Sequence, residues 1–389
     1  MLNNKVKLII LAAISSSVLM VGCGSTENEE KVEEKKATMT MEDLLDKEKN
    51  ILVDKEGDKY LYLTNNNELC LWDESDNEVQ VIDKEENENY DIAFADIFGN
   101  KIAYKKITAD GTTGVQGYNY GTFVGELDES GKYVANTSFV SEKGILEGYI
   151  IDGNRLVVSY DSKNDDKNTS VILYEFGFDY GFELFNSDNY FHNLHLANNL
   201  LVFNIGETTT SEDDKKDVEV KNDTYVINIE GIDRADVLTE NMVTKIEDIK
   251  NPLVYGEKIY GLTSLENGSE DLIEYDMVTK EKKVIISGEE YSIEPNSTTY
   301  ILGENLYISG YNYANKSFVG SVNLADGKYT PTKFEDKVLI RKEFDDSLLI
   351  EKMTNDNYDN PETIYEIMKV EVSKEVKEAD SDEQKKEAE

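Results

Sequence analysis

Histidine is scarce in this chain, with only His192 and His195 among 389 residues. Histidine is the side chain most often used for acid–base catalysis and for binding transition metals. The two histidines lie three residues apart in a stretch with strand character, which places their rings on opposite faces of a strand. We interpret both as structural. The sequence indicates no catalytic residue, no metal ligand and no cofactor.

Other motifs of enzyme chemistry are also missing. Neither the Gly-x-Ser-x-Gly elbow of a serine hydrolase nor a glycine-rich phosphate loop occurs. The 80 acidic side chains are too numerous for any one pair to indicate a glycosidase without a fold. The acidic stretches 73–78 and 161–166 lack the ligand spacing of a calcium loop, so we interpret them as exposed hairpin turns.

Positive charge is in short supply as well. The chain has 40 Lys and Arg against 80 Asp and Glu, a formal net charge of −40. Binding to nucleic acid requires clustered lysine and arginine that displace counterions from phosphates, so we exclude nucleic acid as a partner. The acidic surface favours solubility and keeps the body away from anionic membranes.

Only two cysteines occur, Cys23 and Cys70. Cys70 lies within the apolar run Glu68-Leu69-Cys70-Leu71-Trp72, where no neighbouring histidine could activate the thiol. We expect Cys70 to be a small, buried side chain of a strand. Cys23 has a different context, because it ends the N-terminal hydrophobic segment.

That N-terminal segment has the parts of an export signal. Lys5 and Lys7 precede an apolar stretch from 8 to 21, which Gly22 and Cys23 follow. The 14 residues of this stretch would span roughly 21 Å as a helix, less than the roughly 30 Å of a hydrocarbon core. A permanent membrane span is therefore not expected.

The run Met20-Val21-Gly22-Cys23 resembles the lipobox of bacterial lipoproteins. This resemblance implies that residues 1–22 are a signal peptide, that Cys23 carries lipid, and that the protein is held on the extracytoplasmic face of the cell membrane. Cys70 would then have no partner for an intrachain disulfide. Residues 23–40 are strongly charged, and we expect them to form a disordered tether between the lipid and the body.

The body is predicted to be all-β. From 41 to 372, short runs rich in β-branched and aromatic residues alternate with clusters of Gly, Asn, Asp and Lys. A helix is expected only over Met41 to Lys49, with Thr40 as its N-cap. The acidic end, 373–389, is expected to be a disordered tail.

A weak repeat runs through the body, in which a polar turn is followed by a polar residue and two apolar ones, as in Gly256-Glu257-Lys258-Ile259-Tyr260. The leading apolar positions are 42 to 59 residues apart, close to the roughly 40 to 50 residues of a four-stranded propeller blade. These positions are Tyr60, Ile102, Leu156, Leu200, Ile259, Leu306 and Leu348, and polar insertions lie at 111–121, 162–169 and 208–222. We predict a seven-bladed β-propeller, with six or eight blades or a pair of β-sandwiches as alternatives.

The body is similar to that of bacterial lipoproteins with degenerate propellers of the Gly-x-Lys-Ile-Tyr type. Because no nucleophile, phosphate loop or histidine cluster occurs, we favour a non-catalytic binding or scaffolding module for a protein or cell-envelope ligand. The alternative is a metal-dependent propeller enzyme, of the lactonase or glycan lyase kind, with carboxylates around a central channel. A substrate-binding lipoprotein of a transporter would need an α/β body, which the scarcity of helical periodicity argues against.

Tyrosine is the one aromatic residue in excess, with 24 Tyr against 13 Phe and one Trp. Two clusters lie among Gly and Asn residues, Tyr118 with Tyr120 and Tyr311 with Tyr313. Tyrosine-rich loops often bind peptides or glycans, although tyrosine is also common in strands. We expect these four tyrosines to form the ligand surface.

Overall fold

A computed structural model describes residues 39–369, apart from 89, 109–120, 141–144, 153–154, 162–168, 176–180, 208–220, 231–236, 292, 294–296, 312–316, 332–337, 345 and 355–361. The described residues belong to one compact unit that starts at Met39. The expected signal peptide, Cys23, the tether up to residue 38 and the tail lie outside the described residues. Those expectations stay predictions.

Seven antiparallel sheets make up this unit, and each is built from strands that are consecutive in the sequence. Blade 1 holds β1 (Asn50–Glu56), β2 (Lys59–Thr64), β3 (Glu68–Asp73) and β4 (Glu78–Lys84). Blade 2 holds β5 (Tyr90–Phe98), β6 (Lys101–Thr108), β7 (Gly121–Leu127) and β8 (Tyr133–Val140). Blade 3 holds β9 (Ile145–Asp152), β10 (Arg155–Asp161), β11 (Thr169–Glu175) and β12 (Gly181–Ser187).

The second half of the unit continues in the same way. Blade 4 holds β13 (Tyr190–Ala197), β14 (Leu200–Glu207), β15 (Lys221–Asn228) and β16 (Thr244–Ile246). Blade 5 holds β17 (Lys250–Tyr255), β18 (Lys258–Ser264), β19 (Glu270–Asp276) and β20 (Lys282–Ile286). Blade 6 holds β21 (Thr298–Leu302), β22 (Asn305–Tyr311), β23 (Ser317–Asn323) and β24 (Tyr329–Pro331). Blade 7 has three described strands, β25 (Val338–Glu343), β26 (Ser347–Met353) and β27 (Thr363–Lys369).

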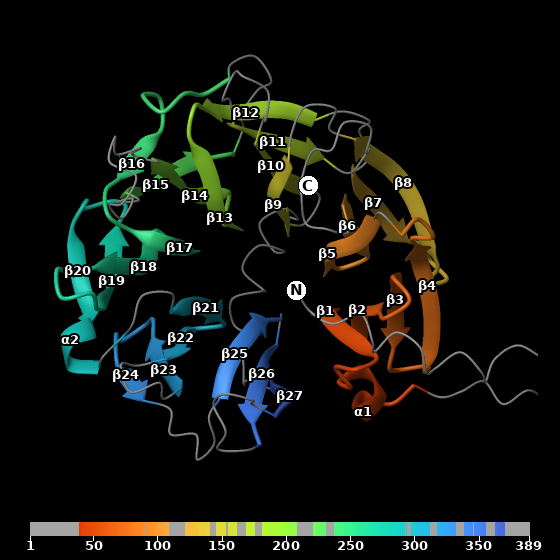
Figure 1. Cartoon of the computed structure of the whole chain (residues 1–389). Helices are drawn as coiled ribbons and strands as arrows, with labels where there is room; N and C mark the ends of the chain where they lie inside the picture. The colour runs from red at the N-terminus through yellow and green to blue at the C-terminus, as the bar shows by residue number, and fades with distance from the viewer. Residues whose placement is uncertain are drawn as a thin grey trace, which may run out of the picture. The chain divides into compact units, whose positions relative to one another are not determined.

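The blades follow one another around a ring, with the first strand of each nearest the centre (Figure 1). Contacts join the first strands of neighbouring blades from β1 through β5, β9, β13, β17 and β21 to β25. Blade 7 meets blade 1 through a contact of 3.2 Å between the Lys342 ammonium and the Asp54 carboxyl, which closes the ring. The seven-bladed β-propeller is therefore confirmed. The alternatives of six or eight blades and of paired sandwiches are wrong.

Two-residue turns explain the repeat seen in the sequence. In blades 1, 2, 4, 5 and 6 such a turn joins the first strand to the second. Its first residue is a glycine with φ between 58° and 60° at Gly57, Gly99, Gly256 and Gly303. This left-handed conformation suits glycine and matches the twist of a hairpin. The Gly-x-Lys-Ile-Tyr pattern is therefore a hairpin turn followed by the second strand of a blade.

The structure corrects one position of the repeat. The second residue of the second strand is Leu201 in blade 4, whereas the sequence pattern indicated Leu200. Leu201 is fully buried, and Leu200 is only partly buried. Two leucines in a row conceal which one packs against blade 3 and which against blade 5, because a shift of one residue exchanges the two faces of a strand.

The apolar core lies between neighbouring blades and not within them. Leu61 and Leu69 of blade 1 pack with Ile102 of blade 2, and each of the other seams that contain described core residues has a cluster of the same kind. Each sheet thus buries side chains on both faces. This explains why the sequences of the second strands are short, nearly continuous apolar runs.

The expected N-terminal helix is present but short. It is α1 (Met41–Leu44), and the hydroxyl of Thr40 accepts a hydrogen bond from the Asp43 backbone N–H at 3.1 Å, which confirms the cap. The chain leaves the helix early because Asn50 already pairs with Thr64 in the first hairpin. A second short helix, α2 (Gly288–Tyr291), follows blade 5. No helix among the described residues is long and apolar enough to cross a membrane.

The N-terminal segment also seals the seam between the last and first blades. Leu44 is fully buried in a cluster that includes residues of blades 1 and 7. Lys47 forms an ion pair with Glu351 of β26 at 2.6 Å, and its ammonium lies 4.0 Å from the ring centre of Tyr365 on β27. No strand is exchanged between blades 7 and 1 among the described residues, so side chains alone hold this seam.

Candidate functional site

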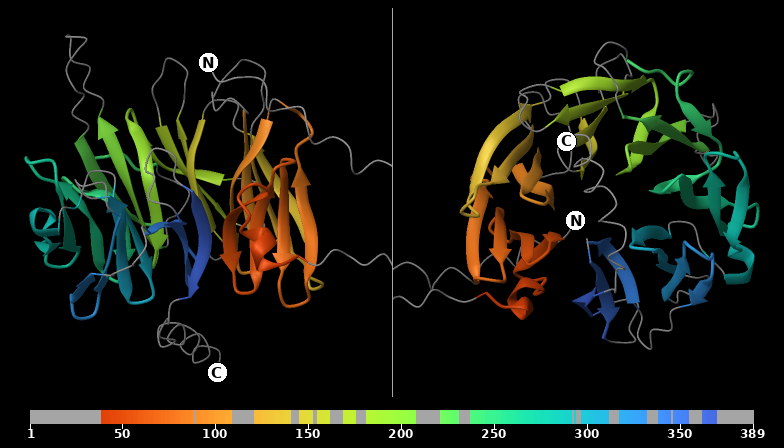
Figure 2. Two further views of the ribbon diagram at one scale, coloured as in Figure 1. Left: turned by 60° about the horizontal axis from the view of Figure 1, so that its bottom comes forward. Right: turned by 180° about the vertical axis from the view of Figure 1, so that it is seen from behind.

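The strand ends of the ring lie on two faces (Figure 2). Because strands within a blade are antiparallel, the first-to-second and third-to-fourth connections lie on one face, which we name the short-turn face. The second-to-third connections and the links between blades lie on the other, which we name the loop face. The two faces differ strongly in the lengths of their connections.

Nearly all long connections belong to the loop face. On the short-turn face, first-to-second turns have two residues in six blades, and third-to-fourth turns have four or five in five of the six four-stranded blades. On the loop face, long second-to-third connections span 109–120, 162–168, 208–220 and 354–362. The three insertions recognised in the sequence are among these. Connections of variable length on one side of a rigid scaffold are where binding sites concentrate.

One long connection of the short-turn face has a structural role. The segment 229–243 joins β15 to β16, and its Leu238 exchanges backbone hydrogen bonds with Leu184 and Asn186 of β12. The side chain of Leu238 packs against the core cluster of blades 3 and 4. This connection therefore covers the seam between those two blades.

Both tyrosine clusters are flanked by strand ends that lie on the loop face. Tyr118 and Tyr120 belong to the connection 109–120 of blade 2, and Tyr313 belongs to 312–316 of blade 6, outside the described residues. Tyr311 is the last residue of β22 and pairs with Ser317 of β23. Blades 7 and 1 lie between these two blades. That the four tyrosines form a ligand surface stays a prediction.

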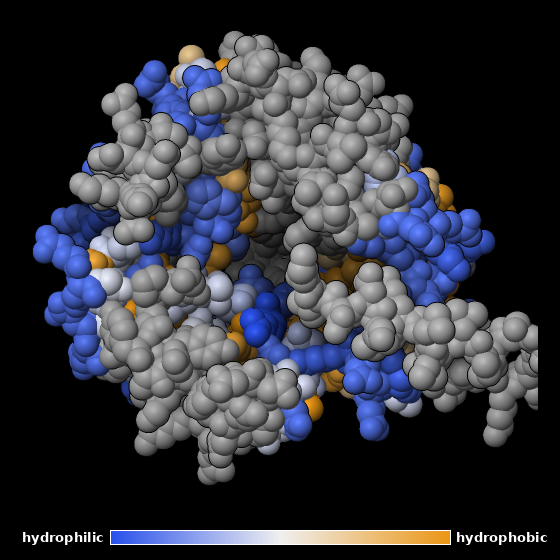
Figure 3. Space-filling view, in the orientation of Figure 1, coloured by the Kyte–Doolittle hydropathy of each residue, from blue (hydrophilic) through white to orange (hydrophobic). Residues whose placement is uncertain are grey.

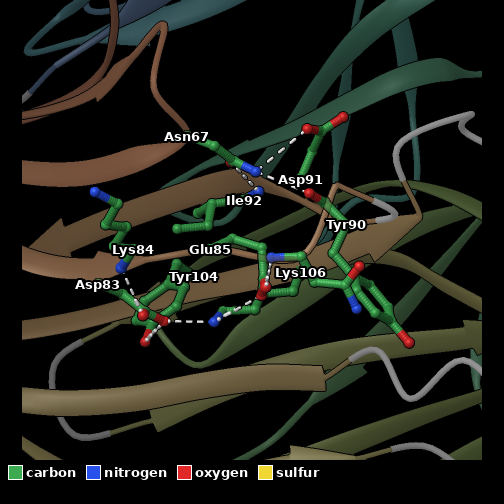
Figure 4. A network of polar contacts seen from close by, with 10 residues as sticks. Asn67, Asp83, Lys84, Glu85, Tyr90, Asp91, Ile92, Tyr104 and Lys106 are labelled. Carbon is green, nitrogen blue, oxygen red and sulfur yellow. Dashed lines mark hydrogen bonds and ion pairs between the residues drawn. The ribbon is translucent and has the colours of Figure 1, made fainter.

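The end of β6, which leads into 109–120, is held by charged side chains of two blades (Figure 4). The ammonium of Lys106 lies 2.9 Å from an oxygen of Asp83 and 3.1 Å from one of Glu85. These side chains are 16%, 23% and 14% exposed, respectively. Burial opposes the charge on Lys106, but the two carboxylates outweigh it and raise the Lys106 pKa. The ion pairs tie β6 to the outer strand of blade 1.

Aromatic side chains extend this support to β7. The Tyr104 hydroxyl donates a hydrogen bond to Asp83 at 2.7 Å, and burial together with that carboxylate raises the Tyr104 pKa well above its usual value. The ring of Tyr104 stacks on Phe123 of β7 with centroids 5.2 Å apart. The Lys106 ammonium lies 5.1 Å from the centre of the Phe123 ring. Both strands that flank 109–120 are therefore anchored.

Polar links between blades stiffen the loop face further. Asn67, in the second-to-third turn of blade 1, donates to the Tyr90 carbonyl and accepts from the Ile92 N–H, both at 2.8 Å (Figure 4). Asn204 of β14 is fully buried and donates to the Ile249 carbonyl at 2.7 Å, just before blade 5. Amides that satisfy backbone groups of the next blade fix the relative position of the two.

A second charged cluster lies beside the centre of the ring. Lys342 of β25 is 3.2 Å from Asp54 of β1 and 3.2 Å from Asp96 of β5, so one lysine joins three blades. Asp54 also accepts a hydrogen bond from the Ile97 N–H at 2.8 Å. Figure 3 shows hydrophilic side chains gathered over β25 and β1 at the edge of the central hollow.

Burial sets the protonation of this cluster. It raises the pKa of Asp54 to about 8; the Lys342 ammonium opposes this rise and the nearby Asp96 carboxylate adds to it. The metal-dependent enzyme alternative requires carboxylates that are open to a cation, whereas Asp54 and Asp96 here face a lysine. In the part of the chain that the structure describes, no group of three or more His, Cys, Asp or Glu could hold a metal ion.

The rare residues have structural positions. His195 Nδ1 accepts a hydrogen bond from the Val254 N–H of blade 5 at 3.2 Å, and burial lowers the His195 pKa to about 4. Cys70 is buried in β3, which confirms the expectation of a small, buried side chain of a strand, and burial raises the pKa of its thiol to about 11. Residues 74–77 of the stretch 73–78 form the turn between β3 and β4, as interpreted, whereas 162–166 of the other acidic stretch lie outside the described residues.

The sequence reasoning did not find the two charged clusters. Their signal is a single charged residue inside an apolar strand, such as Asp96 between Ala95 and Ile97 or Lys342 after a buried run in β25. A charged residue in such a position needs a partner. With 80 carboxylates in the chain, the sequence does not say which ones are the partners.

No family model and no curated protein matches this chain. Among solved structures, it is similar to a prolyl endopeptidase (TM-score 0.56, 14% identity, 80% of this chain and 46% of that chain). It is similar to the β-propeller domain of the Trilobed protease from Pyrococcus furiosus, described as having an open velcro topology (TM-score 0.54, 14% identity, 82% and 97%). It is also similar to oligopeptidase B from Leishmania major (TM-score 0.54, 9% identity, 82% and 49%).

These similarities establish the β-propeller fold. The chain spans about half the length of the prolyl endopeptidase and of oligopeptidase B, and nearly the whole length of the isolated propeller domain. At identities of 9 to 14%, the likeness concerns the fold and not the activity.

Proposed function

We propose that this chain is a lipid-anchored, extracytoplasmic β-propeller that binds a protein or cell-envelope ligand through its loop face and catalyses no reaction. The observation that carries the proposal is the concentration of long connections on one face of a ring whose other face has short turns apart from 229–243, which covers a seam between two blades. A scaffold braced by links between blades can hold such connections in place, which reduces the ordering cost of binding.

The proposed ligand surface includes the two tyrosine clusters. Tyrosine supplies a large contact area at a low cost in conformational entropy, and its hydroxyl adds a hydrogen-bonding group. The networks around Lys106 and Tyr104 anchor the strands on both sides of 109–120. A ligand that contacts Tyr118 and Tyr120 would therefore meet a connection with fixed ends.

Binding is tested by cosedimentation with envelope fractions of the source bacterium. The test variant combines Tyr→Ala changes at 118, 120, 311 and 313, and we expect its affinity for the envelope fraction to fall at least tenfold. The control carries Met242→Ala and Val278→Ala, two side chains of the short-turn face that are each 67% exposed. Equal binding by wild type and the tyrosine variant, or equal loss in the control, would show that the loop face is not the ligand surface.

The enzyme alternative is tested in parallel by thermal unfolding with and without millimolar CaCl₂. The binding-module proposal expects no specific stabilisation by calcium. A rise in melting temperature that disappears on Asp54→Asn substitution would instead favour a carboxylate metal site at the centre of the ring.

The anchor is supported by the lipobox-like run ending at Cys23. We expect the full chain, expressed in a bacterium supplied with labelled palmitate, to incorporate the label and to lose residues 1–22. Cys23→Ser should abolish labelling, whereas Cys70→Ser should not, because that thiol is buried in β3. Absence of label in the wild-type protein would remove the lipid anchor from the proposal.

A further inference from the structure

Six of the seven blades end in an outer strand that is poorly suited to further pairing. In blades 1, 2, 3 and 5, the outermost strand has a shift of register against its neighbour. In blades 4 and 6, the outermost strand has only three residues, and the one in blade 6 ends in Pro331. Bulges, shortness and proline are devices that keep exposed sheet edges from pairing with other chains.

Blade 7 has none of these devices at its described edge. Its outermost described strand, β27, has seven residues and pairs with β26 in unbroken register from Ser347–Lys369 to Met353–Thr363. It contains no proline. A regular strand of this length presents a row of backbone N–H and C=O groups on its open side.

β27 is the third strand of its blade, but its apolar side chains are less buried than those of the other third strands. In each of the other six blades, the third strand includes at least two buried apolar side chains, for example Leu69 and Leu71 in β3. No residue of β27 is buried, and Ile364 is 46% exposed. Tyr365, Ile367 and Met368 are partly exposed as well. A fourth strand would cover what is open here.

We propose that β27 is a strand-acceptor edge, which binds an extended basic segment of a partner protein as the fourth strand of blade 7. In this mode, backbone hydrogen bonds supply affinity and alternate side chains supply selectivity. The surface lies on the outer strand of a blade, so the proposal does not depend on binding at the loop face.

The chain itself offers poor candidates for this strand. In five of the six complete blades, the fourth strand starts after a connection of four or five residues. The corresponding stretch after β27, 375–381, contains one β-branched residue, Val376. The stretch 24–38 before the body contains one hydrophobic β-branched residue, Val32. Both are rich in Glu and Lys, which are depleted in strands.

Charge selects a basic partner over a second copy of the chain. Glu366 of β27 is already ion-paired with Lys352 of β26 at 2.5 Å, so the charge argument rests on the whole body. Two bodies of such acidic composition would repel each other, since the net charge of each chain is −40. A segment that alternates lysine with valine or isoleucine avoids this cost, and the acidic body attracts it.

The test uses a fluorescein-labelled peptide, acetylated and amidated at its ends, in which four lysines alternate with three valines. One control peptide has the same sequence with N-methyl groups at alternate residues, which removes backbone donors but keeps charge and side chains. A second has glutamate in place of lysine. We expect the first peptide to bind the purified body and to slow amide exchange in Thr363–Lys369 at least tenfold. Both controls should bind at least tenfold more weakly.

A pair of protein variants localises the binding. Ile364→Lys places a charge on the strand at the open edge and should weaken binding of the first peptide at least tenfold. Val81→Lys changes a valine of the bulged strand β4 that is 54% exposed, and it should leave binding of the first peptide unchanged. Ultracentrifugation of the protein without peptide should show a monomer.

Several results would overturn the proposal. Equal binding of the N-methylated peptide would mean that charge alone retains it. Protection, in the peptide-free monomer, of the β27 amides that point away from β26 would mean that the chain covers this edge itself. A concentration-dependent dimer that protects β27 would identify a second copy as the occupant. Protection confined to the loop-face strand ends would overturn the edge site while leaving the proposed function intact.

Discussion

Replacing Asp54 by asparagine tests whether burial keeps this carboxyl neutral in the folded protein. Asparagine has nearly the same shape and can still accept the hydrogen bond from the Ile97 N–H. Lys342 would keep Asp96 as its ionised partner. The substitution therefore removes little except the titration of Asp54.

The expected magnitude follows from the pKa of Asp54, which burial raises to about 8 in the folded protein. The unfolded value is about 3.9. Between these values the folded state holds a proton that the unfolded state has lost, so the stability contributed by Asp54 falls by about 1.4 kcal/mol per pH unit. From pH 6 to pH 9 the loss is about 3 kcal/mol. For a body of roughly 330 residues, this corresponds to about 4 °C in melting temperature.

The measurement is urea unfolding at pH 6 and pH 9, followed by the fluorescence of Trp72. This residue is the one tryptophan of the chain and is buried in the cluster that joins blades 1 and 7. Relative to wild type, Asp54→Asn should gain about 3 kcal/mol between the two pH values. The exposed control, Asp326→Asn, should gain nothing. If the free energy of unfolding changed equally between pH 6 and pH 9 for Asp54→Asn and wild type, Asp54 would be ionised at both pH values and the reasoning would be refuted.

Three further predictions concern stability in urea. Lys106→Met should lower the free energy of unfolding by about 2 to 3 kcal/mol, because two part-buried carboxylates would face each other; an unchanged midpoint would contradict the role given to this lysine. His195→Gln should reduce the loss of stability in acid. Burial lowers the pKa of His195 in the folded protein to about 4, so wild type loses up to about 3 kcal/mol of unfolding free energy as the pH falls below about 6.5. Identical acid profiles would rule this out. Leu201→Ala should cost about 2 to 5 kcal/mol and Leu200→Ala clearly less, and equal costs would argue against the register described for β14.

The sequence was sufficient to predict the architecture because its signals are local. Short apolar strands, and turns that place glycine in the left-handed region, determine which neighbouring segments pair as hairpins. Repetition of that unit indicated seven blades. The same patterning failed at Leu200, where two adjacent leucines leave the facing side ambiguous until the neighbouring blade is in place.

The candidate site could be predicted only in part. The long insertions were visible as polar stretches, but nothing in the sequence showed that they share one face. That follows from the strand order, because second-to-third connections of every blade emerge on the same side of the ring. The anchoring role of Lys106 was not visible either, since its carboxylate partners belong to the preceding blade.

Local patterning thus decided the strands, the hairpin turns and the number of blades, since each depends on residues close together in the chain. Closure of the ring decided the rest. It brings Lys342 to Asp96, 246 residues away, and to Asp54 of the first blade. It also leaves β27, the third strand of blade 7, as the outermost described strand of its sheet. Contacts of this kind depend on the positions of whole sheets, and no pattern within one strand encodes them.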